Sequence, residues 1–445
     1  MNIIQKILSR MDSISKPQQK FLLVLFSSIF ILCGKVNFTN LSRYSQLNEK
    51  TYRRQFSLPF DFKQFNQYLI AQAIAQESRK IAAIDCSFIP KSGYETYGRD
   101  YFFNGCAGVP EKGLEVSVIS IVDVDNHLGY TLTVEQTPPQ EKSQTSPDFR
   151  ESEKLKSTKK SGQPATSRRF SSKRKKSNKS RKRQFQQSQE PAATRIDFYL
   201  EQLKTAQPYF PKSVRYLVAD GNYSSYKFVN GVVSVELDQI GKLRIDADMR
   251  YLYTGSQKPR GARRKYDGKV KLSDVGRLTE VREVEPKLEL YTARVWHVSL
   301  KRNIRIAYLV DHRQNDKTGY ALLFSTDTDL DADDIYYYYK ARFQIEFIFR
   351  DAKQFTGLTD CQARDEEKLN FHFNASLAAL NIAKLDQWQR HSSAEPFVFS
   401  MASYKRLALN EYLLETFISK LDLEPTSIKN HPNYEELRSY GAIAA

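Results

Sequence analysis

The chain has 445 residues, of which 40% are hydrophobic and 12% aromatic, so it can form two or three domains with at least one large core. Its 68 Lys and Arg residues against 51 Asp and Glu residues give a formal net charge of +17, which makes a polyanion the expected partner. The cysteines are far apart without paired spacing, which argues against a disulfide framework or zinc cluster and favours a reducing cytoplasm: Cys33, Cys86, Cys106 and Cys361.

Residues 1–80 have helical patterns throughout. The apolar run Phe21–Cys33 follows basic residues, as a signal peptide or membrane helix would. It has only 13 residues, against the roughly 20 that a membrane-spanning helix needs. No small-residue cleavage pattern follows it. We therefore predict a buried helix and no membrane partner.

Two short helices are expected within residues 37–56. The first lies around Thr39–Tyr44 and a turn follows at Ser45–Leu47; Asn48 then offers an N-cap for the second. The pair matches a helix-turn-helix whose second helix could enter a major groove of double-stranded DNA. An ordinary helical hairpin with a solvated basic face is the alternative. The DNA-binding candidates on the second helix are Lys50, Arg53 and Arg54.

Strands begin at residue 81. Ile81–Ile89, Glu115–Val124 and Gly129–Gln136 are rich in Val, Ile, Leu and Thr, and a hairpin turn joins the last two. Residues 81–139 therefore form the first part of an α/β core.

Residues 140–193 are low-complexity. Lys154–Arg183 contains 14 Lys and Arg residues and no acidic residue, and removing it lowers the net charge from +17 to +3, since 17 − 14 = 3. Such a segment cannot bury enough apolar surface to fold alone. We predict a disordered basic insertion that binds phosphates without sequence specificity.

The core continues over residues 194–231, with helix Thr194–Ala206, strand Val214–Asp220 and a helix near Ser224–Val229. Residues 232–330 form a β-rich insertion, whose predicted strands are Val232–Leu237, Lys242–Asp246, Leu288–Leu300, Ile304–His312 and Tyr320–Thr326. Residues 331–390 are predicted to belong to the core again and to begin with one long helix. Asp331, Asp333 and Asp334 lie at its first turn, where acidic residues suit the positive end of the helix dipole. Residues 391–445 form a C-terminal helical region.

Three carboxylates lie among apolar neighbours. Asp85 interrupts the first strand, Asp220 ends the strand of the second core part, and Glu346 lies in the helical segment Tyr339–Lys353. A charge in such a setting costs several kcal/mol unless it is paired or binds a metal. In a β-β-β-α-β-α sheet the first and fourth strands are neighbours, so Asp85 and Asp220 can share a metal and a later helix can add Glu346. These residues predict a divalent-metal site that acts on phosphates.

The segment around Glu346 also carries cations. At about 100° per residue on one continuous helix, four residues fall within roughly 40° of Glu346: Tyr339, Arg342, Arg350 and Lys353. The spacing predicts a single face turned toward DNA phosphates and metal.

This spacing, Tyr339-x2-Arg342-x3-Glu346-x6-Lys353, resembles the Y-R-E-K signature of DDE transposases of the insertion sequence four type. Asp220–Tyr223 and Ile81–Ile89 resemble that family's second and first aspartate motifs. The resemblance covers roughly residues 37–390. The long basic segment at 140–193 departs from the family's pattern.

The resemblance implies an α/β fold with a ribonuclease H-like mixed sheet flanked by helices. Asp85, Asp220 and Glu346 would hold two Mg²⁺ ions, with Mn²⁺ as a substitute, while Tyr339, Arg342 and Lys353 would contact the phosphates of a transposon end. The activity implied is metal-dependent cleavage at transposon ends and strand transfer into target DNA. Joining two ends suggests a homodimer, at work on the nucleoid in a bacterial cytoplasm.

Other interpretations stay open. Trp296 could stack on a base at a distorted DNA end, or be an ordinary buried strand tryptophan. The protein could also be a nuclease without strand transfer, or a DNA-binding regulator that uses only the helix-turn-helix and the basic segment.

Overall fold

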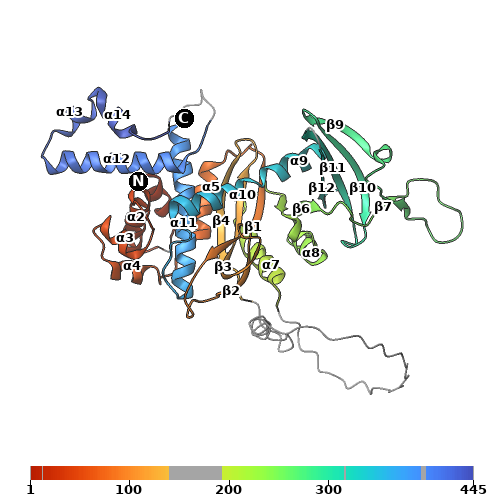
Figure 1. Cartoon of the computed structure of the whole chain (residues 1–445), viewed down its shortest axis with the longest axis horizontal. Coiled ribbons are helices and arrows are strands. Elements are labelled where there is room, and N and C mark those ends of the chain that lie inside the picture. Colours follow the sequence, from red (N-terminus) through yellow and green to blue (C-terminus); the bar gives the residue numbers. More distant parts are fainter. Residues whose placement is uncertain (1, 13, 140–192, 315–316, 392–396, 444–445) are drawn as a thin grey trace, which may run out of the picture. The chain divides into compact units, whose positions relative to one another are not determined.

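The computed structural model describes residues 2–12, 14–139, 193–314, 317–391 and 397–443 (Figure 1). Apart from residue 193, the predicted basic insertion at 140–193 lies outside the described residues. Its flanks belong together, because contacts join Met1–Pro139 and Arg195–Ala445 into one unit.

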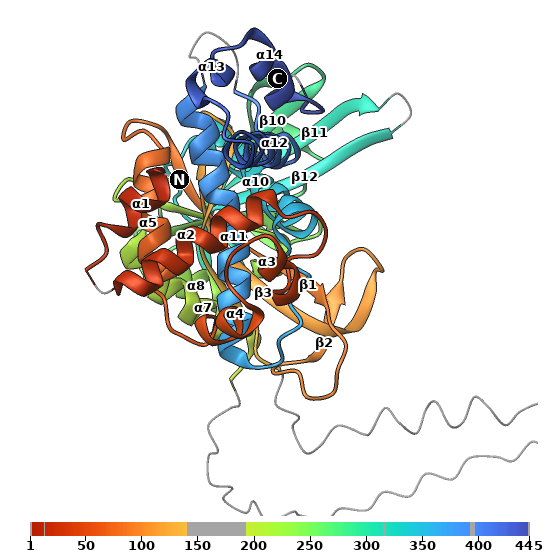
Figure 2. The ribbon, with the colours of Figure 1, turned by 90° about the vertical axis from the view of Figure 1, so that its left-hand side faces the viewer.

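Five helices precede the sheet: α1 (Asn2–Leu8), α2 (Lys16–Ile31), α3 (Phe38–Arg43), α4 (Glu49–Gln55) and α5 (Phe62–Ala73). Leu22, Leu25 and Phe26 of α2 are fully buried, so the prediction of a buried helix is confirmed. Among the described residues, no helix is both long and apolar enough to cross a membrane. Figure 2 shows α2, α3 and α4 beside α11 (Glu366–Arg390), where the rings of Phe56 and Phe371 lie 4.5 Å apart.

The two predicted short helices are confirmed as α3 and α4. Asn48 caps α4, and its side chain accepts a hydrogen bond from the Thr51 N–H at 2.8 Å. Tyr52 anchors α4 in the core, whereas Lys50, Arg53 and Arg54 are exposed. The basic face of α4 is therefore open to solvent.

The first half of the sheet contains β1 (Lys80–Pro90), β2 (Asp100–Asn104), β3 (Val109–Asp123), β4 (Leu128–Gln136), β5 (Tyr216–Ala219) and β6 (Asp238–Leu243). Strands β4, β3 and β1 pair antiparallel, and β1, β5 and β6 pair parallel, in the order β4-β3-β1-β5-β6. The first and fourth predicted strands, β1 and β5, are neighbours as expected. Strand β2 was not predicted; it pairs with the first residues of β3.

Helices cover both faces of these strands. Figure 1 shows α7 (Arg195–Ala206) on one side of β1, β3 and β4, and α5 and α11 on the other. Buried amides join the layers: the side chain of Gln202 donates to the Ser117 carbonyl, and that of Asn381 donates to the Thr131 carbonyl.

The same sheet continues from β6 into β12 (Lys317–Ser325) and then β11 (Arg302–Gln314), β10 (Leu288–His297), β7 (Met249–Leu252) and β8 (Tyr266–Lys269), with β9 (Thr279–Glu285) paired to β10. A second hydrophobic cluster around Val295, Ile304 and Phe324 supports this part. The predicted strand at Val232–Leu237 is wrong. Helix α8 (Tyr226–Ser234) runs through its start, because Phe228, Val229 and Val232 form one buried helical face.

The C-terminal helices are α9 (Ala332–Ala341), α10 (Gln344–Asp351), the π-helix Ala352–Thr356, α11, α12 (Met401–Lys420), α13 (Pro425–Lys429) and α14 (Pro432–Ser439). The predicted single long helix after Asp331 is wrong. It breaks at Arg342–Phe343, where the N–H groups of Phe343, Ile345 and Glu346 bond to carbonyls only three residues back.

Candidate active site

Asp85 and Asp220 come from neighbouring parallel strands. The register pairs Ala83 with Val218 and Ile84 with Ala219, so the next step along both strands places Asp85 beside Asp220. Ile84 and Ala219 are fully buried, which fixes both strands in the centre of the sheet. Both aspartates therefore lie at the carboxyl end of this strand pair.

Glu346 reaches the same place through Arg342. The Arg342 Nη1 donates to Asp85 Oδ2 at 3.1 Å, and its Nη2 donates to Glu346 Oε1 at 3.0 Å. The Arg342 side chain is 12% exposed, against 22% for Asp85 and 41% for Glu346. A largely buried guanidinium thus joins two of the three predicted carboxylates.

The electrostatics tie Asp220 to the group. Burial raises the pKa of Asp85 to about 6, with Arg342 and the Cys86 N–H lowering it and the charges of Asp220 and Glu346 raising it. Burial lowers the pKa of Arg342, but the carboxylates outweigh burial and the net pKa is raised. The three acids and one cation act on each other as a single cluster.

A model of the family described as DDE superfamily endonuclease matches residues 37–301, more than half of the chain. The chain belongs to the DDE superfamily endonucleases. No curated protein matches it. The match contains Asp85 and Asp220 and ends before Glu346. Membership implies a nuclease that acts on DNA, and DDE nucleases use divalent metal ions.

The donor chemistry of this DDE endonuclease suits such an ion. Carboxylate oxygens are the ligands that Mg²⁺ and Mn²⁺ prefer, and the pKa of Asp85 is raised mainly by burial, which a cation bound at this carboxylate would offset. Within the described ranges, however, no three His, Cys, Asp or Glu side chains lie as a ready metal-binding group. The Arg342 guanidinium instead pairs with both Asp85 and Glu346. The sharing of metal by the three acids stays a prediction.

The predicted cation face of one straight helix is only partly present. Tyr339 lies next to Arg342, with the guanidinium 5.6 Å from the ring centre. Arg350 instead pairs with Asp351 at 2.9 Å and covers the Phe347 ring. Lys353 falls in the π-helix. The break at Arg342–Phe343 and the wider π-turn change the rotation per residue, so the angles calculated for one continuous helix apply only within α10, which contains Glu346 and Arg350.

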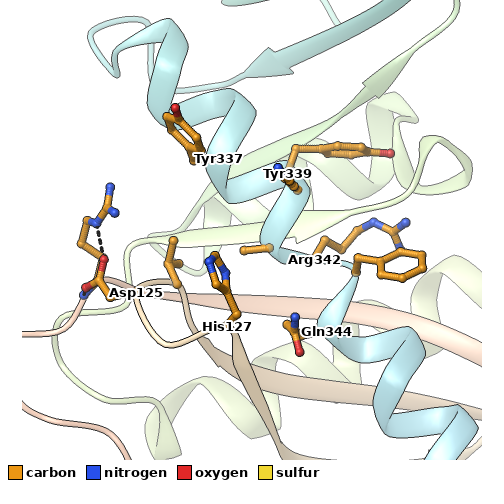
Figure 3. A pocket seen from close by; sticks show the side chains of 11 residues that line it. Asp125, His127, Tyr337, Tyr339, Arg342 and Gln344 are labelled. Atoms are coloured by element: carbon orange, nitrogen blue, oxygen red, sulfur yellow. Dashed lines mark hydrogen bonds and ion pairs between the residues drawn. The ribbon is translucent and has the colours of Figure 1, made fainter. Parts of the chain in front are cut away.

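A cavity of about 780 Å³ opens beside Arg342, between the β3–β4 turn and the break after α9 (Figure 3). Figure 3 shows Tyr339 and Arg342 pointing to the same side, away from Asp125. Lys340 and Arg79 also line the cavity; Lys340 pairs with Glu285, and Arg79 pairs with Asp125 at 2.8 Å. Neither Arg79 nor Lys340 stands out in the sequence, because nothing in their local pattern separates them from other surface cations.

A second hollow of about 1020 Å³ lies beside Asp220, and its lining includes Asn222, Lys242, Arg244 and His297. The sequence did carry a signal here, since Lys242 and Arg244 flank the end of β6. One hollow thus includes Asp220 in its lining and the other includes Arg342, and both linings carry further basic residues.

Trp296 is half-buried on β10, and its ring lies 5.8 Å from that of Tyr266. Its direct strand partners are Asn303 and Arg250, and Arg250 covers the Tyr266 ring. The neighbouring Val295 faces the second hydrophobic cluster instead. Trp296 is therefore neither fully buried nor fully open, and its role stays a prediction.

Proposed function

We propose that the protein is a DNA transposase of the insertion sequence four type with a ribonuclease H-like catalytic core. Three antiparallel strands followed by two parallel ones, in the order β4-β3-β1-β5-β6, support this core. The observation that carries the proposal is the juxtaposition of Asp85 with Asp220 in register and with Glu346 through Arg342.

In this proposal Asp85, Asp220 and Glu346 hold two Mg²⁺ ions, or Mn²⁺ in their place. When bound, such ions would activate a water molecule or a DNA 3′-hydroxyl for attack on the phosphate and would stabilise the leaving oxygen of an in-line displacement. The chain itself keeps Asp85 partly shielded from water, with the Arg342 side chain paired to it. Tyr339 lies beside Arg342, and burial raises the pKa of this tyrosine. Arg342, Tyr339, Arg350 and Lys353 contact phosphates of the cleaved end, and arginine does so with two parallel hydrogen bonds.

Recognition of the end is assigned to the helix-turn-helix. The side chains of Lys50, Arg53 and Arg54 are exposed and suit contacts with the major groove or the phosphate backbone of DNA. Arg53 also pairs with Glu49 at 2.5 Å. Trp296, with Tyr266 and Arg250 beside it, offers a stacking surface for an unpaired base. Two ends would be joined in a homodimer that acts on chromosomal DNA at the bacterial nucleoid.

The regulator alternative has less support. A protein that binds DNA only through the helix-turn-helix and the basic segment would not need a half-buried Asp85 with a raised pKa next to two further acids. A nuclease without strand transfer differs only in its last step, and a pre-cleaved end offered with a target plasmid separates the two.

The test is cleavage of a labelled duplex that carries an end of the encoding element, with Mg²⁺. We expect Asp85→Asn, Asp220→Asn and Glu346→Gln each to abolish cleavage while duplex binding survives. Asp238→Asn is the matched control: Asp238 begins the next parallel strand, opposite Tyr216 at the amino end of β5, and its Oδ1 accepts from Thr326 at 2.7 Å. Cleavage retained by any of the three active-site variants would remove that residue from the site.

A further inference from the structure

Arg342 occupies the place where a shared cation would be expected. Its two terminal nitrogens reach different carboxylates, Asp85 at 3.1 Å and Glu346 at 3.0 Å. A guanidinium that lies between two acids neutralises part of their charge, and it repels a second cation at the same point. Metal binding by these acids therefore requires Arg342 to move.

The surroundings of Arg342 allow such a movement. It lies at the break that ends α9, outside both helices. Its Nε is buried, with no partner among the described residues. The cavity of about 780 Å³ opens directly beside it. The side chain is thus held by its two ion pairs and by the Tyr339 ring, whose centre lies 5.6 Å from the guanidinium, and it has an open space next to it.

A DNA phosphate is the group that could draw Arg342 away. The planar fork of arginine binds two phosphate oxygens at once and is more weakly hydrated than an ammonium group. Arg79 and Lys340 also line the cavity, and both already pair with acids. The cavity lining therefore carries three cationic residues, and Arg342, whose side chain points away from Asp125 (Figure 3), is the one that also holds Asp85 and Glu346.

We propose that Arg342 gates the metal site: without DNA it closes Asp85 and Glu346 against divalent ions, and a DNA phosphate in the cavity opens them. This inference rests on the proposed function and adds the order of assembly, DNA before metal. Coupling of this kind is reciprocal, so metal must strengthen DNA binding by the same factor as DNA strengthens metal binding.

The test measures Mn²⁺ binding to the full-length protein by electron paramagnetic resonance, with and without a duplex carrying the element's end. For the wild type we expect the duplex to tighten Mn²⁺ binding about tenfold, within the range of roughly 5- to 150-fold that is typical of coupled sites. Arg342→Gln should bind Mn²⁺ tightly without DNA and gain nothing from the duplex. Arg390→Gln is the control, since that arginine pairs with Asp386 at 2.9 Å on α11 and has no assigned role in DNA or metal binding, and it should behave as wild type.

Arg342→Lys covers the case in which the glutamine variant does not fold. An ammonium group keeps the charge but cannot bridge both acids with a fork, so this variant should show an intermediate Mn²⁺ affinity without DNA. A folded Arg342 variant that binds Mn²⁺ no more tightly than wild type would overturn the gate while leaving the active site intact. If no form binds Mn²⁺ even with DNA, and the carboxylate variants still cleave, the proposed function itself fails.

Discussion

Replacing Asp85 with Asn should make the fold more stable while it abolishes cleavage. Burial raises the pKa of Asp85 from 3.8 to about 6. The shift is 6 − 3.8 = 2.2 units, and at about 1.36 kcal/mol per unit the charged side chain destabilises the fold by about 3 kcal/mol at neutral pH. Asn has the same shape without the charge, so the variant should recover up to that amount.

The pH dependence follows from the sign of the shift. The folded state holds the Asp85 proton more tightly than the unfolded state. The stabilisation that this proton gives the wild type is therefore complete below pH 3.8, decreases as the pH rises, and is lost above about pH 6. Asp85→Asn should therefore match wild type near pH 4 and exceed it at pH 8. The assay is urea unfolding of both proteins at several pH values without metal. A variant that is no more stable at pH 8, or a difference that does not change with pH, would refute the reasoning.

Three further predictions concern other parts of the chain. Changing Lys50 and Arg54 together to Ala should leave the melting temperature unchanged, because both side chains are exposed. In a plot of the logarithm of the DNA-binding constant against the logarithm of the salt concentration, the double variant should have a slope smaller in magnitude by about two. Deleting residues 154–183 removes 14 cations and should weaken binding to all DNA sequences alike in filter-binding assays; a loss confined to one sequence would contradict it. Burial lowers the pKa of Lys384 from 10.5 to about 8, so the folded state loses this proton at a lower pH than the unfolded state. In urea unfolding, the wild type should therefore become more stable as the pH rises from about 8 to 10.5, and Lys384→Met should not.

Local patterns predicted much of the fold. Apolar runs such as Ile81–Ile84 became fully buried central strands, and Asn48 became the expected N-cap. The missed strand β2 is short, and its Tyr101 and Phe103 are exposed at the sheet edge, so alternation could not reveal a buried face. The break at Arg342–Phe343 was not predicted because neither residue is Gly or Pro, and both keep right-handed helical angles in the structure.

The candidate site divides in the same way. Strand order alone placed Asp85 beside Asp220, since pairing of the first and fourth strands is a property of the topology. The sequence predicts that Arg342 contacts phosphates, whereas in the structure its guanidinium bridges Asp85 and Glu346. That pairing spans 257 residues of chain and depends on how α10 packs against β1, which no local pattern encodes.

The central claim is that one cation site joins Asp85, Asp220 and Glu346, and Fe²⁺ can map it directly. Iron in place of magnesium, with ascorbate and peroxide, releases hydroxyl radicals that cut the backbone near the ion, and mass spectrometry locates the cuts. With a bound DNA end, we expect cuts near all three residues, suppressed by excess Mg²⁺ and lost in Asp220→Asn. Cuts near only one of the three, or cuts elsewhere that Mg²⁺ suppresses, would contradict a shared site.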